Sequence, residues 1–475
     1  MAVTEKRESD RVTTSSRQSS GRQVPGPRGH AVFGSIPAFR RNVIQALLDG
    51  WHEYGDVVRF RLGGRLASYL LVHPDDVKRV LQDNHFAYHK DPFSFGKLKE
   101  TIGEGLLTSE GDFWLRQRRL IQPAFHRQRI AALGGIMTDS ALAMLDRWEV
   151  HARAGDEVDV AAEMMRLTLD VVAKSMFGAD VVEDAAAVGR ALSIILEHTN
   201  RRIQAYVDMP GTLPFPGNFR FRSAVKVLDR IVYRLIDERR RSGQESNDLL
   251  SMLLHARDAD SGESMNDHQL RDEVMTIFLA GHETTAVALT WTWYLLSRHP
   301  EIARRVRIEL AEVLGGRTPT VEDLPNLSYT RTVIDESMRL YPPAWIIARA
   351  PIADDEIRGY RIPAGSSIFI SSYLTHRHPD FWENPEGFDP ERFTPERSAG
   401  RPRYAYFPFG GGPRQCIGNG FALQEAQLIL ATVAQRYRLD LVPGHRVAML
   451  PLITLRPRYG MRMTIRPIES PTARS

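Results

Sequence analysis

The stretch FGGGPRQCIG, residues 409–418, places the only cysteine of the 475-residue chain just after three consecutive glycines. Glycines at 410–412 let the backbone turn sharply and approach a flat ligand closely, because they lack side chains and adopt positive φ angles readily. The segment that follows, IGNGFALQEAQLILATVAQRYRL, has helical periodicity, so Cys416 lies at or near a helix N-terminus. Backbone N–H groups there favour the thiolate, which is the form that binds a metal.

Three other interpretations of Cys416 have to be weighed. A lone cysteine is often a small buried hydrophobe. A glycine-rich turn before a helix can also cradle a phosphate, but here it has neither a parallel-strand setting nor the lysine or dinucleotide fingerprint of such loops. A nucleophilic cysteine of a hydrolase would need a histidine base, and the residues alone leave that possibility open.

Composition limits the class of protein. A single cysteine excludes an intrachain disulfide and is too few for an iron–sulfur cluster or a cysteine-built zinc site. The chain is 43% hydrophobic and 25% charged, which is ordinary for a globular protein with a core large enough to enclose a cofactor. Without a Gly/Ser-rich linker or an internal repeat, we expect one large domain in a reducing compartment.

The opening segment, residues 1–24, is polar and rich in serine and arginine, and it carries part of the net charge of +4. We expect it to be a disordered tail. It lacks the apolar run of about 7 to 15 residues of a signal peptide and the about 20 of a membrane span. We therefore expect a soluble, cytoplasmic protein without a membrane anchor. Nucleic-acid binding is disfavoured because no aromatic residues interleave with the basic ones.

Hydrophobic periodicity predicts a mainly α fold with a small antiparallel β region. A helix is expected from Arg41 to Gly55, followed by a hairpin of VVRFRL (57–62) and ASYLLV (67–72). Apolar residues then recur at helical spacing from Pro74 to about Leu340. Extended segments return near 359–372 and 449–466.

Residues 409–418 resemble the haem-binding loop of the cytochrome P450 family, whose pattern is Phe-Gly-x-Gly-x-Arg-x-Cys-x-Gly. The fixed positions are matched by Phe409, Gly410, Gly412, Arg414, Cys416 and Gly418. The resemblance implies a P450-like fold over residues 25–467 as a single domain, with 468–475 as a C-terminal tail. It also implies haem b, iron protoporphyrin IX, with the Cys416 thiolate as its axial ligand.

A second family pattern is AGHETT, residues 280–285, inside a helix expected from Asn266 to Pro300. At about 30 residues and about 45 Å this helix would cross the domain. Gly281 and the hydroxyls beside it are poor helix formers, which points to a local bulge; a simple packing notch is the alternative. The resemblance implies that Thr284 orients dioxygen and water and that Glu283 relays protons. His282 is expected to be structural.

Two further patterns imply a buried structural network. ESMRLYPP (336–343) places Glu336 and Arg339 three residues apart on one helical face. Such a pair alone would indicate only a weak surface salt bridge. FDPERF (388–393) supplies Arg392, which in the resembling family joins the pair beneath the thiolate side of the haem.

The pattern WLRQR (114–118) places an indole and a guanidinium four residues apart on one side of a helix. Buried haem propionates need charge-assisted partners. The resemblance assigns this task to Trp114, Arg118 and Arg414, with Arg349 as a fourth. The alternative for Arg118 is a solvated arginine in a basic helix.

The resemblance implies a monooxygenase that uses O2 to hydroxylate or epoxidise a hydrophobic small molecule such as a fatty acid, terpenoid, steroid or polyketide. Its pocket would be lined by the region around His85 to Leu107, the helices flanking Pro210 to Gly217, Phe278 and Ala280 of the central helix, the segment 344–347 and the turn near Ile453. No flavin or nicotinamide module fits beside residues 25–467, so an external ferredoxin or flavodoxin with its reductase would supply electrons. The RQRR helix would form a basic docking face. A monomer is expected.

Three alternatives to an O2-dependent monooxygenase remain open. A peroxide-driven peroxygenase of the same family is expected to replace the acid and the threonine of the central helix, whereas this chain keeps both. A non-catalytic haem sensor should lack that pair and carry a signalling module. A cysteine-nucleophile hydrolase would be colourless when pure.

Overall fold

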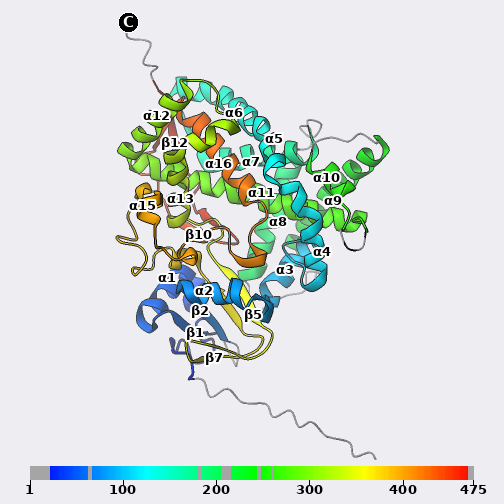
Figure 1. Cartoon of the computed structure of the whole chain (residues 1–475), viewed down its shortest axis with the longest axis vertical. Coiled ribbons are helices and arrows are strands. Elements are labelled where there is room, and N and C mark those ends of the chain that lie inside the picture. Colours follow the sequence, from blue (N-terminus) through cyan, green and yellow to red (C-terminus); the bar gives the residue numbers. More distant parts are fainter. Residues whose placement is uncertain are drawn as a thin grey trace, which may run out of the picture.

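The computed structural model describes most of the chain as a mainly helical body with its largest sheet at one end (Figure 1). The described residues are 22–62, 67–178, 185–204, 215–242, 248–258, 260 and 262–468. Residues 1–21 of the expected polar tail, the expected turn at 63–64 and the C-terminal residues from 469 onward lie outside them.

The central helix is α11, Asp267–Arg298, with 32 residues. Asn266 caps its start, because its Oδ1 accepts the N–H of Gln269 at 2.9 Å and the Gln269 side chain accepts the N–H of Asn266. Pro300 begins the next helix, α12 (Pro300–Leu314), so α11 ends at the expected residue. The predicted crossing helix is confirmed, and most of its side chains are buried.

The other helices surround α11, and α7 lies against it along much of its length. Before it in the chain come α1 (Ile36–Tyr54), α2 (Pro74–Lys78), α3 (Pro92–Ile102), α4 (Gly111–Ile121), α5 (Arg127–Ala132), α6 (Gly134–Ala154), α7 (Val160–Phe177), α8 (Ala185–Gln204), α9 (Pro216–Ser242) and α10 (Leu249–His255). After it come α12, α13 (Ser328–Leu340), α14 (Ser372–Thr375), α15 (Pro395–Ser398) and α16 (Asn419–Ala434).

The largest sheet has the strand order β1-β2-β8-β5-β3. The expected hairpin of β1 and β2 is antiparallel, whereas β8, which the helical body separates from β2 in the chain, pairs with β2 in parallel. The sheet strands are β1 (Val57–Arg61), β2 (Ala67–Leu71), β3 (Tyr88–Lys90), β5 (Ile347–Pro351) and β8 (Ser367–Ile370). The remaining strands are β4 (Glu157–Asp159), β6 (Asp355–Ile357), β7 (Tyr360–Ile362), β9 (Tyr437–Leu441), β10 (Met449–Pro451), β11 (Leu455–Pro457) and β12 (Arg462–Pro467).

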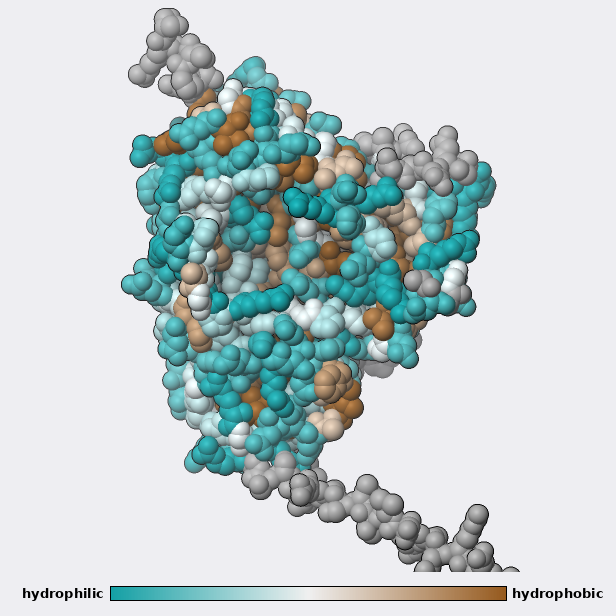
Figure 2. Space-filling model, in the orientation of Figure 1, coloured by the Kyte–Doolittle hydropathy of each residue, from teal (hydrophilic) through white to brown (hydrophobic). Residues whose placement is uncertain are grey.

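Short irregular helices shape the connections. They are the π-helical turn η1 (Arg79–Asp83) and the 3₁₀ turns η2 (His85–Ala87), η3 (Gln122–Phe125), η5 (Val321–Asn326), η6 (Pro390–Phe393), η7 (Arg403–Ala405) and η8 (Gly412–Arg414). The face in view in Figure 2 is largely hydrophilic, with apolar residues in small patches. Within the described residues, no helix combines the length and apolar character needed to cross a bilayer.

Candidate active site

A cavity of about 2020 Å³ lies between α11, the start of α16 and the five-stranded sheet. Its walls come from segments far apart in the chain, including α1, α3, α4, α8, α11, β5, the loop 408–418 and the turn after β10. Side chains on these walls are mainly apolar, which suits a hydrophobic ligand. Cys416 is on the wall, and its side chain is exposed to the cavity.

The loop that presents Cys416 is held by its own backbone. The N–H of Cys416 donates to the carbonyl of Phe409 at 3.0 Å, and α16 begins three residues later, at Asn419. Gly412 has a φ of 66°, and a Cβ there would lie 1.8 Å from the carbonyl oxygen of Leu81. Only glycine is accommodated at that position.

The surroundings of Cys416 set its acidity. The side chain faces the cavity but is enclosed by the surrounding protein, and this desolvation raises the pKa of the thiol above its usual range, while the N–H of Gly418 and the charge of Arg118 oppose that rise. A metal ion that binds the sulfur would provide the missing charge compensation and displace the proton.

Two cations on the cavity wall have no acidic partner among the described residues. Arg349 is buried and donates only to the carbonyl of Ala348, and burial lowers its pKa to about 10. Lys90 is also buried, donates to the carbonyls of Leu106 and Ser109, and has its pKa lowered to about 7 by burial. Glu110 acts on both cations, and Glu273 on Lys90, only without a direct ion pair. Buried cations of this kind fit a ligand that brings its own carboxylates, as the two propionates of haem would.

The other predicted propionate partners line the same cavity. Both terminal nitrogens of Arg414 donate to the carboxylate of Glu110, and its guanidinium lies 4.9 Å from the centroid of the Trp114 ring. Arg118 donates to the carbonyl of Gln415 at 3.0 Å, beside the cysteine, so it is not the solvated arginine of the alternative interpretation. The structure therefore brings all four predicted residues together, and it adds Lys90, which the sequence analysis missed.

Helix α11 passes the cavity without a bulge. Its backbone is α-helical throughout Ala280–Thr285, so the local bulge expected from Gly281 is not present. A Cβ on Gly281 would lie 3.1 Å from Cγ2 of Val172 on α7. The glycine serves close helix packing, which was the simpler of the two interpretations.

Thr284 and Glu283 both line the cavity. The Thr284 hydroxyl donates to the carbonyl of Ala280 at 2.8 Å. The buried carboxylate of Glu283 accepts from Nε of Arg456 at 2.6 Å and from the hydroxyl of Thr454, both beyond β10. Arg456 was not among the predicted residues, because nothing local in the sequence connects it with a helix 173 positions earlier.

The remaining residues of the predicted pocket behave differently from one another. Ala280, residues 344–347 and Ile453 line the cavity. Phe278 is instead 1% exposed and packs in the core. His282 is also buried and bonds through Nδ1 to the carbonyl of Phe278, which leaves it off the cavity wall; burial lowers its pKa.

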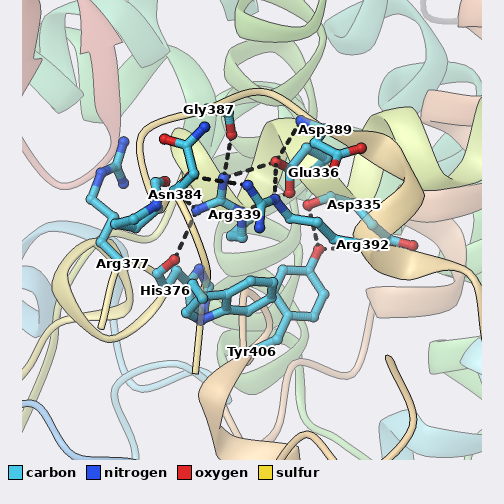
Figure 3. Close-up of polar contacts among 12 residues, drawn as sticks. Asp335, Glu336, Arg339, His376, Arg377, Asn384, Gly387, Asp389, Arg392 and Tyr406 are labelled. Atoms are coloured by element: carbon cyan, nitrogen blue, oxygen red, sulfur yellow. Dashed lines mark hydrogen bonds and ion pairs between the residues drawn. The ribbon is translucent and has the colours of Figure 1, made fainter. Parts of the chain in front are cut away.

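Glu336, Arg339 and Arg392 meet in a buried network that does not line the cavity (Figure 3). Arg339 makes a bidentate pair with Glu336, at 2.6 and 2.8 Å, and both side chains are fully buried. Arg339 also donates to the carbonyls of His376, Pro385 and Gly387.

Arg392 completes this network from η6. Its Nε lies 3.3 Å from Oε1 of Glu336, and its terminal nitrogens donate to the carbonyls of Glu383 and Asn384. The network thus ties the segment 376–392 to α13, ahead of the loop that carries Cys416.

Comparison with known proteins places these features in a family. A model of the family described as "Cytochrome P450" matches residues 24–460. Cyclooctatin synthase of Streptomyces melanosporofaciens is 38% identical over 94% of this chain and 95% of its own length. Cyclooctat-9-en-7-ol 5-monooxygenase of the same organism is 40% identical over 91% and 94%. Pentalenene oxygenase of Streptomyces avermitilis is 36% identical over 87% and 91%.

These matches extend over nearly the whole chain, including the Cys416 loop, α11 and the Glu336 network. Members of the family bind haem through a cysteine thiolate, and Cys416 is the only cysteine that this chain has to offer. The chain therefore belongs to the cytochrome P450 family and is a haem-thiolate monooxygenase that acts on a hydrophobic small molecule with O2.

Proposed function

We propose that this enzyme oxidises a polycyclic terpenoid, with electrons delivered one at a time by a separate ferredoxin or flavodoxin. The observation that carries the proposal is the mainly apolar cavity with Cys416 on its wall, large enough for haem and a multi-ring ligand. Three similar proteins are named for terpenoid-type products or substrates, which supports this class over fatty acids and polyketides.

Haem with a thiolate ligand supplies the activation of dioxygen and the transfer of one oxygen atom to a C–H bond. The residues of this chain position the reactants and control protons. Trp114, Arg118, Arg349 and Arg414, with Lys90, hold the propionates. Thr284 offers a hydroxyl on the cavity wall that orients dioxygen and water. Glu283 hands on protons, and its bonds to Thr454 and Arg456 fix where its carboxylate lies.

A reduced carbon-monoxide difference spectrum, combined with product analysis under labelled dioxygen, tests the proposal. We expect the band of a thiolate-ligated haem and one labelled oxygen atom in the product of a polycyclic terpenoid. A haem-replete protein that oxidises fatty acids but none of a panel of polycyclic terpenoids would contradict the substrate class. Labelled product formed only with peroxide would favour the peroxygenase alternative.

Replacing Glu283 by glutamine should slow oxygen transfer by about 10²-fold or more, because general acid–base groups contribute about 10²–10⁴-fold. Glutamine can still accept from Thr454 and Arg456, and the partly exposed guanidinium of Arg456 stays in contact with solvent, so the fold of the site is kept while the transferable proton is lost. We expect less product and more peroxide per electron consumed, together with a larger solvent isotope effect. Ser297→Ala, near the end of the same helix, is the control. Unchanged coupling in Glu283→Gln would argue against the proton relay.

The proposed electron donor would dock beside the Cys416 loop. Two arginines of the expected basic face are already neutralised, since Arg116 and Arg119 pair with Glu263 and Asp258 between α10 and α11. The exposed cations Arg127 and Arg129 of α5 and Arg403 of η7 remain, with no acidic partner in the described part of the chain.

Helix α5 is suitably placed, because its Ile130 carbonyl accepts from the Gln424 side chain on the first turns of α16. Arg403 lines a shallow pocket together with Phe409, Gly410 and Gln415 of the loop. The electrostatic attraction of an acidic partner is thereby directed to the thiolate side of the haem site.

Reversing two of these charges, in Arg127→Glu/Arg129→Glu, should slow reduction by an acidic ferredoxin about tenfold or more at low salt, since electrostatic steering changes association rates by about 10 to 10³-fold. In the unaltered protein the rate should fall steeply as salt is added, and the double variant should lose that dependence. Stopped-flow reduction measures both, with Arg220→Glu on α9 as the control. Salt-independent reduction of the unaltered protein would contradict the docking face.

We also propose that residues 25–467 form one domain, that the protein acts as a monomer and that it works in the cytoplasm. The single cysteine supports a reducing compartment.

A further inference from the structure

We propose that Asn200 recognises an oxygen atom already present on the substrate, so that this enzyme acts on a hydrophobic molecule oxygenated by an earlier step. The inference rests on the proposed function and names the kind of terpenoid that the cavity takes. It starts from a buried amide nitrogen without a partner, on a residue that lines an otherwise mainly apolar wall.

Asn200 lies near the end of α8 and lines the cavity, yet its side chain is only 4% exposed. Its Oδ1 accepts the backbone N–H of Ile453 at 2.8 Å, which ties α8 to the turn that follows β10. Its Nδ2 is buried and has no hydrogen-bond partner in the structure. A buried amide donor without a partner is costly, and the few polar groups of an apolar ligand cavity serve to orient the ligand.

The orientation of the amide follows from this bond. A backbone N–H can only donate, so the atom of Asn200 that faces Ile453 must be the oxygen. The nitrogen must then point the other way, with two N–H donors to offer. If the amide were flipped, its NH2 group would face the N–H of Ile453. Two donors cannot bond to each other, so that arrangement is excluded.

The N–H donors of Asn200 favour ligands that carry a hydrogen-bond acceptor. Hydroxyl, ether and carbonyl oxygens accept an N–H bond, whereas an unmodified terpene hydrocarbon offers none. A hydrocarbon bound here would leave Nδ2 desolvated and unpaired, and sites built to bond a substrate oxygen discriminate strongly against analogues that lack it.

The surroundings make this oxygen a fixed reference point on the ligand. Ile453 and Leu196, one turn before Asn200 on α8, provide apolar contact on the same wall. Thr454, the next residue in the turn, bonds to Glu283. The ligand oxygen would therefore anchor one end of the molecule while another carbon is presented for oxidation. The reaction that precedes this one must install a hydroxyl, ether or carbonyl on the hydrocarbon, as an earlier oxygenation or a water-quenched cyclisation does.

Isothermal titration of the haem-loaded protein with matched ligands tests the inference. The probes are the cedrane and androstane skeletons, each as the hydrocarbon, a ring alcohol and the corresponding ring ketone. We expect the alcohol and ketone of at least one skeleton to bind about five- to tenfold more tightly than the hydrocarbon, as one neutral hydrogen bond provides. In Asn200→Leu both ratios should fall to about one.

Two further variants guard the interpretation. Asn200→Asp keeps an acceptor for the N–H of Ile453. At alkaline pH the ionised carboxylate cannot donate, so this variant should lose the preference for the ketone. An alcohol can still donate to the carboxylate. Ser193→Ala, on an exposed position of α8, should behave as the unaltered protein. Unchanged hydrocarbon affinity in Asn200→Leu would show that the cavity is intact.

Equal preferences in the unaltered protein and Asn200→Leu, for both skeletons, would overturn the inference. That result would leave the proposed function standing as long as the carbon-monoxide spectrum and terpenoid oxidation are normal. Loss of those two properties in the unaltered protein would instead refute the proposed function.

Discussion

Changing Cys416 to serine should remove the thiolate signature from the reduced carbon-monoxide spectrum and reduce product formation by more than about a hundredfold, because even groups that only support a metal ligand contribute about 10- to 100-fold. A serine hydroxyl stays protonated and is a poor ligand, and no second cysteine exists to replace the sulfur. The reduced carbon-monoxide spectrum measures the first effect. The rate of product formation, with the same electron donor supplied to both proteins, measures the second.

Asn419→Ser is the matched control for this change. It introduces serine three residues later, at the first residue of α16, where the Asn419 side chain accepts the N–H of its neighbour Gly420. Its spectrum should be that of the unaltered protein. A Cys416→Ser variant that kept both the spectrum and the rate would mean that the sulfur is not the ligand.

The second large effect is expected in the Glu336 network. Glu336→Gln leaves the guanidinium of Arg339 fully buried without a counter-charge, and removing one partner of a buried ion pair costs about 3–5 kcal/mol. Domains are stable by only about 5–15 kcal/mol in total. We therefore expect a much lower urea midpoint and poor retention of haem, because losing the charge of Glu336 weakens its contacts with Arg392 and with the N–H of Asp389, which help to anchor the segment 376–392 on α13.

A matched change outside the network provides the comparison. Glu149 on α6 pairs with Arg153 four residues later, and both side chains are more than half exposed. Glu149→Gln should leave the urea midpoint almost unchanged, since exposed pairs of this kind contribute little. Equal midpoints for the two variants would show that the buried pair does not stabilise the fold.

Local sequence predicted the parts of the site that local geometry determines. Helical spacing located α11 and its ends, because the Asn266 cap and Pro300 act on their immediate neighbours. The loop glycines and Cys416 were equally readable, since the turn and the helix start adjoin them in the chain.

Contacts between distant segments could not be predicted in the same way. Lys90 bonds with carbonyls 16 and 19 residues later, and Arg456 reaches Glu283 across 173 residues. The same limitation explains the expected basic face, because only the fold shows that Arg116 and Arg119 meet acidic residues before α11. The bulge at Gly281 was wrongly expected because its packing partner, Val172, lies on another helix.

The turn that follows β10 is fastened on both sides, by Asn200 to Ile453 and by Glu283 to Thr454. On the roles that we propose for Asn200 and Glu283, two adjacent residues of this turn support both ligand recognition and the coupling of electron consumption to product formation. Directed evolution that mutates this turn to change selectivity would also lower the amount of product formed per electron consumed. Libraries aimed at new ligands would do better to vary cavity-lining residues outside this turn, such as Phe93 and Phe95 of α3.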